Sequence, residues 1–280
     1  MIELWNLLLF HPLLNSLIFL DRLTGNFGWS VVLLTVFLRL AMTPLVLPSL
    51  RLSKKMQDLA PELAKLKELH KDNKTALMTA QAELYKQHGA NPASGCLPQV
   101  VQILVLIALF NAFNSVLVPN GNLTEKLQPQ LYSFNRLPSD FHLSTKFMYF
   151  DLAKPDTFKL PSFPLPLPGA LLLITGIVQL LQSKMMAPVV KTEEKIAQKT
   201  PQESDDAMVA VQQQMLYMFP IMTVVFGYQF PSGLVLYWLV FSLVSMVQQY
   251  YATGWGGLAP WLYRLGLLKS SHERSFNSNT

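Results

Sequence analysis

The chain has 280 residues, of which 51% are hydrophobic and only 14% are charged, and its formal net charge is +5. Soluble domains carry about 25% charged residues, so this composition argues against a soluble domain and indicates a membrane protein. The single cysteine, Cys96, excludes an internal disulfide bond and a metal site built from several cysteines.

Residues 1–22 are the first predicted element, a helix that lies in the membrane interface. The segment is apolar, but it begins with the acidic Glu3 and has neither a basic leader nor a clear cleavage site, so a signal peptide is not expected. His11 and Pro12 interrupt a segment that is already short for a span. An amphipathic interfacial helix is therefore favoured over a sixth transmembrane helix.

Five transmembrane helices are predicted from long stretches that are almost free of Asp, Glu, Lys and Arg. A spanning helix needs about 20 apolar residues, and the first three spans each occupy a separate stretch. The last stretch is broken at "YQFPSG", where Pro231 and Gly233 predict a tight turn between two spans. The predicted spans are residues 28–47, 97–118, 169–187, 209–229 and 233–251.

Residues 51–95 predict a helical hairpin between the first two spans. Apolar residues recur there at intervals of four and three, which is the spacing of a heptad seam. Pro61 predicts a kink or a restart of the helix, and a second helix ends at Gly89. The leucines either only hold the two helices together or also form a docking surface. The seam comprises Leu52, Met56, Leu59, Leu63, Leu66 and His70.

The distribution of basic residues predicts which loops face the cytoplasm. Residues 51–95 carry eight Lys/Arg, so we place them inside the cell. The N-terminus is then external, the loop 188–206 is cytoplasmic and the loop 119–168 is external. The predicted order is an interfacial helix (1–22), span one with its flank (28–50), the cytoplasmic hairpin (51–95), spans two to five (96–251) and a cytoplasmic tail (252–280).

Arg39 is a permanent cation inside the first predicted span. It is residue 12 of a span that begins at Gly28, which places it roughly 18 Å from the outer end. Burying a charge there costs about 3 kcal/mol. No predicted span contains an acid, and Pro44, which has no N–H, leaves only one carbonyl group free nearby. Water is the remaining partner, so we predict a hydrated recess in the helix bundle and a functional role for Arg39.

Polar residues on the other spans are candidates for lining this recess. Gln102 lies near the inner end of span two, and Gln179 shares a face of span three with Gly176 and Ser183. A polar stripe on span five has intervals of four, three and four. For any one of these groups alone, hydrogen bonding between helices is the more common role, and both roles stay open. The stripe comprises Trp238, Ser242, Ser245 and Gln249.

Three stretches of the chain carry a family resemblance. They are "LLTVFLRLAMTPL" in the first span, "LYKQHGANPASGCLPQVVQ" (84–102) before and in the second, and "FPSGLVLYWLVFSLVSMVQQYY" (230–251) in the last. Each is similar to the corresponding part of the YidC/Oxa/Alb family of membrane protein insertases, and "MQDLAPELAKLKE" resembles the first helix of that family's cytoplasmic hairpin. The resemblance covers about residues 10–255. It implies five spans around a hydrophilic groove that is open to the cytoplasm and to lipid but closed toward the outside.

The resemblance also implies groove residues and a function. The groove has a cation on the first span, one glutamine each on spans two and three, and two aromatic substrate contacts on the last span; Thr35 is a further lining residue. Such an insertase and chaperone takes hydrophilic parts of nascent membrane proteins into the groove and releases their transmembrane helices into lipid. The implied groove residues are Thr35, Arg39, Gln102, Gln179, Tyr237 and Trp238.

The resemblance sets expectations for partners and location as well. Nascent membrane proteins, membrane lipids, the Sec translocon and the ribosome are the expected partners. The short, mildly basic tail argues against tethering a ribosome, and the loop 119–168 is long and proline-rich for the family. We expect a functional monomer in a bacterial plasma membrane, with no catalytic residue, no cofactor, no metal and no nucleic-acid substrate.

Two other classes of function are compared with an insertase. A small transporter or channel would use Arg39 to bind an anion, but such proteins often contain internal repeats, and we find no convincing repeat in this sequence. An intramembrane protease needs an Asp pair, an H-E-x-x-H motif or a Ser–His arrangement within the spans. The predicted spans contain no Asp or Glu, so catalysis is set aside.

Overall fold

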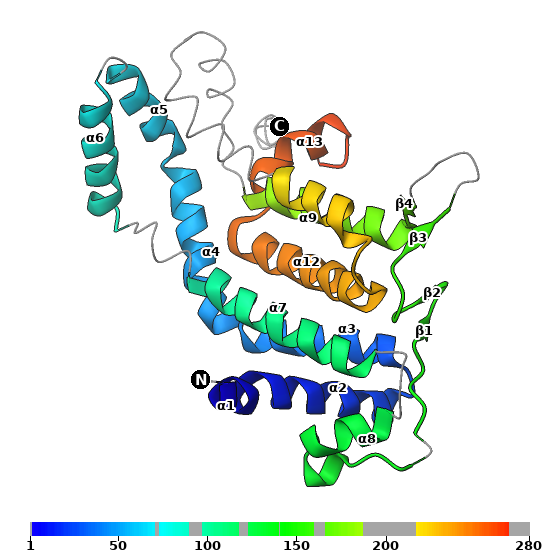
Figure 1. Ribbon diagram of the computed structural model, residues 1–280. Helices are drawn as coiled ribbons and strands as arrows, with labels where there is room; N and C mark the ends of the chain where they lie inside the picture. Colours follow the sequence, from blue (N-terminus) through cyan, green and yellow to red (C-terminus); the bar gives the residue numbers. More distant parts are fainter. Residues whose placement is uncertain are drawn as a thin grey trace, which may run out of the picture. The chain divides into compact units, whose positions relative to one another are not determined.

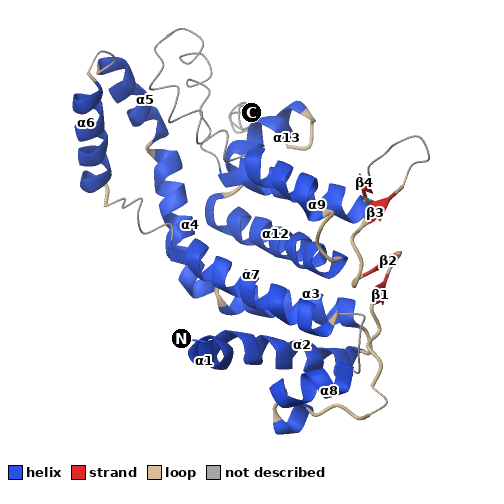
Figure 2. Cartoon of the chain, in the orientation of Figure 1, coloured by secondary structure: helices blue, strands red, loops and turns tan. Residues whose placement is uncertain are grey.

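The computed structural model describes residues 2–70, 73–89, 97–117, 123–139, 141–159, 166–186 and 217–268. In this part of the chain helices dominate, and short strands occur only between Lys146 and Pro168 (Figure 2). Two compact units form, and each is described by itself. The first consists of Met1–Leu45, Cys96–Gln179 and Met218–Ser245, and the second consists of Val46–Gly95, Leu180–Tyr217 and Met246–Thr280.

The N-terminal part of the first unit is a nearly continuous run of helix (Figure 1). It comprises α1 (Ile2–Trp5), the π-helical turn η1 (Asn6–Phe10) and α2 (His11–Thr24). Gly25 ends α2 in the left-handed conformation (φ 69°), and its N–H donates to the Asp21 carbonyl oxygen over 2.7 Å. By length and composition Glu3–Thr24 can cross a membrane, so the interfacial position of residues 1–22 stays a prediction.

The first predicted span consists of two helices rather than one. α3 (Phe27–Ala41) ends at Met42, and α4 (Thr43–Asp58) follows after a bend of 63°. The cause is Pro44, which has no N–H to donate to the carbonyl four residues earlier and so interrupts the helical hydrogen bonds. The prediction of one continuous helix with Arg39 near its middle is therefore wrong, because Arg39 lies in the last turn of α3.

Helices also cover the other predicted spans. α7 (Leu97–Val116), α9 (Ala170–Met186), the helix Tyr217–Gly227 and α12 (Ser232–Thr253) lie within or close to spans two to five. The loop 188–206 and the start of the fourth span lie outside the described residues. Two described helices, Glu3–Thr24 and α12, are long and apolar enough to cross a membrane. The bent pair α3–α4 is a third candidate if it counts as one span. The count of five spans remains a prediction.

The core of the first unit takes its side chains from α2, α3, α7, α9 and α12, together with residues of the loop between α7 and α9. Leu17 of α2 and Val235 of α12 are fully buried in one cluster with residues of α3 and α7. Phe27 and Phe113 join α3 to α7 by an edge-to-face contact with 5.9 Å between ring centroids. This packing fixes the helices that carry the candidate site.

The loop between α7 and α9 contains regular structure that the sequence did not predict. It begins with α8 (Leu123–Leu127), which is followed by short 3-10 turns at Gln128–Gln130 and Ser133–Asn135. Two antiparallel pairs of two-residue strands follow, so the all-α prediction omits a small amount of β structure. The pairs are β1 (Lys146–Phe147) with β2 (Phe150–Asp151), and β3 (Thr157–Phe158) with β4 (Leu167–Pro168).

This loop holds the first turns of three helices. At α3, the Asn26 side-chain amide donates to the Lys146 carbonyl oxygen over 2.9 Å. At α12, the Ser232 N–H donates to the Lys154 carbonyl oxygen over 2.8 Å. At α9, the Asp156 carboxylate accepts the N–H of the third residue over 3.0 Å. The loop therefore satisfies backbone and side-chain groups at one end of each of these helices.

The second unit contains the predicted hairpin, made by α5 (Ala60–Leu69) and α6 (Lys74–Gln87). Leu59 and Leu84 are buried. Four partly buried residues pack against them, and three of these four belong to the predicted seam. Pro61 lies in the first turn of α5, where its missing N–H costs little, which confirms a restart of the helix. The neighbours are Leu52, Leu63, Leu66 and Tyr85. Beyond α12 this unit ends in a 3-10 turn at Gly256–Leu258 and α13 (Ala259–Arg264).

We expect Asp156→Ala to lower the free energy of unfolding by about 1 kcal/mol, because an N–H at the start of α9 loses its acceptor. The measurement is the fraction of detergent-solubilised protein that stays monodisperse after heating. Lys154→Ala in the same loop is the control, since its side chain is 77% exposed and forms a surface ion pair with Asp151. Equal losses in the two variants would contradict the capping role.

Candidate functional site

Arg39 lies at the end of α3 and faces α12. Its surface is only 8% exposed. The guanidinium carbon lies 4.6 Å from the centroid of the Phe241 ring, a distance at which the cation is attracted to the face of the ring. The last turn of a helix also carries a partial negative charge. These two interactions offset part of the cost of burying the charge.

Gln102 and Tyr237 connect α7 to α12 next to this cation. The side-chain amide of Gln102 donates to the Tyr237 hydroxyl oxygen over 2.5 Å, and Tyr237 is 2% exposed. The Tyr237 and Phe241 rings lie 6.0 Å apart between centroids. Arg39, Gln102, Tyr237 and Phe241 therefore form one connected set, which we call the Arg39 cluster. Three of its members are residues that the family resemblance implied.

Thr35 and Gln179 are buried, and they differ in how their polar groups are satisfied. The Thr35 hydroxyl donates to the Val31 carbonyl oxygen over 2.6 Å, within its own helix. The Gln179 side-chain oxygen has no hydrogen-bond partner among the described residues. A buried acceptor left in this state costs about 1–3 kcal/mol. Gln179 thus offers an open hydrogen-bonding position that Thr35 does not.

Trp238 belongs to a different set of contacts from Tyr237. Consecutive residues of an α-helix point in directions about 100° apart, so the two side chains cannot share a face. The Trp238 ring packs edge-on against Phe230 with 5.6 Å between centroids, and Phe230 packs against Phe110 of α7 at 5.9 Å. The described ring contacts and hydrogen bonds do not join Trp238 to the Arg39 cluster.

The predicted polar stripe on span five is largely buried. Ser242 and Ser245 are almost completely buried in the first unit, and Gln249 is equally buried in the second. The Ser245 hydroxyl donates to the Phe241 carbonyl oxygen over 2.7 Å. These hydroxyl and amide groups therefore lie inside the protein, whereas Trp238 is only partly buried.

Phe241 is the member of the cluster that sequence reasoning missed. It lies four residues after Tyr237 and so one helical turn further on the same face. That spacing was readable, but a phenylalanine in an apolar span gives no sign that it faces a cation. The hydrated recess predicted around Arg39 stays a prediction; the described contact of its guanidinium group is with an aromatic ring.

The chemistry open to the Arg39 cluster is electrostatic attraction and hydrogen bonding. A guanidinium group, an amide and a phenol suit a carboxylate or another group rich in acceptor oxygens. Among the described residues, no group of three or more His, Cys, Asp or Glu side chains is arranged to hold a metal ion.

Comparison with known proteins gives one consistent result. The family model described as "60Kd inner membrane protein" matches residues 19–255. A "Membrane protein insertase YidC" of Fusobacterium nucleatum is 33% identical over 231 residues, which cover 82% of this chain and 88% of the relative. "Membrane protein insertase MisCA" of Bacillus subtilis is 31% identical over 255 residues, covering 89% and 79%.

Other relatives are much longer than this chain. "Membrane protein insertase YidC" of Geobacter sulfurreducens is 33% identical over 247 residues, which cover 88% of this chain but only 37% of the relative. The matched region is therefore nearly the whole of some relatives and little more than a third of others.

We expect the Gln102–Tyr237 hydrogen bond to contribute about 0.6 kcal/mol to stability, the average for such bonds between membrane helices. The measurement is a double-mutant cycle with Gln102→Leu and Tyr237→Phe, followed by the free energy of unfolding in detergent. Tyr237→Phe keeps the ring that packs against Phe241 and removes only the hydroxyl. Strictly additive effects of the two substitutions would show that the bond contributes nothing.

Proposed function

The chain belongs to the 60Kd inner membrane protein family, and we propose that it is a membrane protein insertase of the bacterial membrane. It takes hydrophilic parts of nascent membrane proteins into a groove and releases their transmembrane helices into lipid. The observation that carries the proposal is Arg39, a cation held among apolar helices in a chain whose relatives are named insertases. A permanent charge in such a position is functional by default, because it is costly to keep.

Arg39 would act on the polar flank of a substrate. A carboxylate about 4 Å from a guanidinium gains about 4 kcal/mol at an effective dielectric constant of about 20. The cation–π contact with Phe241 is worth about 0.5–2 kcal/mol. The guanidinium group can stay stacked on the Phe241 ring and still present N–H groups to an acidic group that enters the groove.

The remaining groove residues would accept and guide the substrate. The Gln102–Tyr237 bond holds α7 to α12 beside the cation, and the free side-chain oxygen of Gln179 can accept a hydrogen bond from a polar substrate group. Trp238, whose ring is only partly buried, presents an aromatic surface to the apolar part of the substrate. Burial of about twenty apolar residues in lipid then drives release, with no covalent step.

The membrane arrangement in this proposal has five spans, an external N-terminus and a cytoplasmic C-terminus. In this arrangement the N-terminal helix lies in the external interface, and its second half contacts the loop between α7 and α9. Trp5 and Lys126 line one pocket, and the Asn15 side chain accepts the Tyr132 N–H over 2.7 Å. Arg22 donates to a carbonyl oxygen of the same loop. A 22-residue helix is about 33 Å long, so a spanning helix would have its ends on opposite sides of the membrane.

The same loop would close the groove toward the outside. It supplies hydrogen-bond partners to the first turns of α3, α9 and α12, which are the external ends of these helices in the proposed orientation. The hairpin 51–95 then faces the cytoplasm, where its basic residues meet anionic lipids. The Sec translocon and the ribosome are proposed partners, and the protein acts as a monomer.

We expect Arg39→Glu to impair insertion of substrates with acidic external tails more than insertion of substrates with neutral tails. The reason is that the new carboxylate repels the acids that the guanidinium attracts. The measurement is an in vitro insertion assay that compares two tails on one substrate. Arg51→Glu, an equal change of charge on an exposed side chain of α4, is the control. Equal loss for both tails counts against the electrostatic role, and anion flux into liposomes that depends on Arg39 would favour a channel or transporter.

We expect cysteines placed near both ends of the N-terminal helix to be labelled from outside the cell. The test uses Glu3→Cys and Arg22→Cys, both at exposed positions, in a Cys96→Ser background with a membrane-impermeant maleimide. Thr79→Cys in the hairpin is the control and should react only after the membrane is opened. If only Arg22→Cys reacts in intact cells, the helix spans the membrane.

A further inference from the structure

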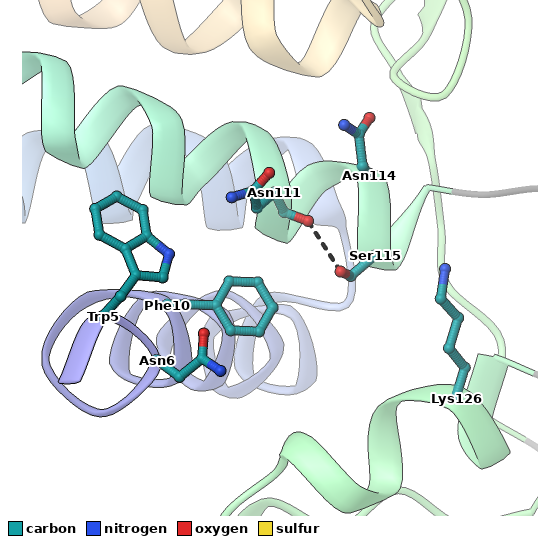
Figure 3. Close-up of a pocket in the computed structure, with 7 residues that line it drawn as sticks. All are labelled: Trp5, Asn6, Phe10, Asn111, Asn114, Ser115 and Lys126. Carbon is teal, nitrogen blue, oxygen red and sulfur yellow. Dashed lines mark hydrogen bonds between the residues drawn. The ribbon is translucent and has the colours of Figure 1, made fainter. Parts of the chain in front are cut away.

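A second polar site lies in the first unit, away from the Arg39 cluster. It is a pocket of about 380 Å³ whose walls come from the N-terminal helices, the end of α7 and α8. Figure 3 shows Lys126 extending from α8 toward the end of α7 that carries Asn114 and Ser115, with the rings of Trp5 and Phe10 beside α7. None of its residues belongs to the groove described above.

The polar groups of the pocket suit an anion. Asn6, Asn111 and Asn114 line it, and each carries a side-chain amide that can donate and accept hydrogen bonds. The Ser115 hydroxyl donates to the Asn111 carbonyl oxygen over 2.9 Å (Figure 3). Lys126 supplies one positive charge, and none of the lining residues is acidic. Several N–H donors around a single ammonium group match the oxygen atoms of a phosphate.

The surroundings of the pocket indicate that this phosphate belongs to a lipid. Trp5 and Phe10 line the pocket, and such rings are enriched where hydrocarbon meets headgroups. The same helical run exposes three leucines, Leu4, Leu7 and Leu8, each with more than 60% of its surface accessible. A soluble anion would gain nothing from these apolar side chains, whereas acyl chains would cover them.

We propose that this pocket binds the headgroup of an anionic phospholipid of the phosphatidylglycerol type. The phosphate lies near Lys126, and the asparagine side-chain oxygens accept hydrogen bonds from the glycerol hydroxyls. A zwitterionic headgroup carries an ammonium group, for which the lining offers no carboxylate. The bound lipid would connect the start of the N-terminal helix to α7 and α8.

The test is native mass spectrometry of the full chain in detergent with added dioleoylphosphatidylglycerol or dioleoylphosphatidylethanolamine. We expect the first lipid to bind about fivefold more tightly, the factor that one Lys near a lipid surface provides. Lys126→Gln should remove this preference, and Asn114→Ala should weaken it. Lys146→Gln is the matched control, because it removes the same charge from an exposed side chain of the same loop.

Three results would overturn the proposal. Equal binding of the two lipids to the unaltered protein would contradict the assignment of a phosphatidylglycerol-type headgroup. Equal effects of Lys126→Gln and Lys146→Gln on lipid binding would show that the lipid responds to the net charge of the protein and not to a specific site. Displacement of the lipid by millimolar inorganic phosphate would assign the pocket to a free anion. Each result is independent of whether Arg39 takes part in insertion.

Discussion

The cost of holding a guanidinium group among apolar helices is the constraint on which the rest of the site depends. No predicted span contains a carboxylate, and a helix end and the face of the Phe241 ring supply part of the compensation. Dipoles and rings lower the energy of a cation without cancelling its charge. A salt bridge within the spans would have used up the attraction that an acidic substrate group meets. This kind of compensation is compatible with the proposed role, in which Arg39 attracts a substrate group and later releases it.

A proline determines where this cation lies. Pro44 interrupts the helical hydrogen bonds, α3 ends at Met42, and Arg39 becomes part of a last turn instead of a helix interior. The Thr43 hydroxyl donates to the Arg39 carbonyl oxygen over 3.1 Å and so replaces part of the interrupted pattern. The charge thus belongs to the helix turn that carries a partial negative charge. A straight helix through this region would have lost that contribution and left the guanidinium more dependent on water.

The sequence predicted the helices well because their signals are local. Apolar stretches marked α7, α9 and α12, and the heptad spacing marked the leucines that pack in the hairpin. It missed the break in the first span, although Pro44 was visible, because a proline in a membrane helix either kinks the helix or ends it. The strands of the loop between α7 and α9 are two residues long, too short to show a periodic pattern. Gln102 and Tyr237 are 135 residues apart, so their contact was reachable only through the family resemblance, and Phe241 carried no polar signal.

The two cationic sites differ in a way that follows from their side chains. Arg39 is buried and planar, so it can stack on a ring and still present two parallel N–H groups to a carboxylate. Lys126 is exposed and flexible, and an ammonium group acts as a strongly hydrated point charge that suits a phosphate at the membrane surface. A lysine at position 39 would lose the stacked, forked geometry, and an arginine at position 126 would gain little from it. In the two proposals, arginine therefore meets a carboxylate within the helix bundle, and lysine meets a lipid headgroup at the membrane surface.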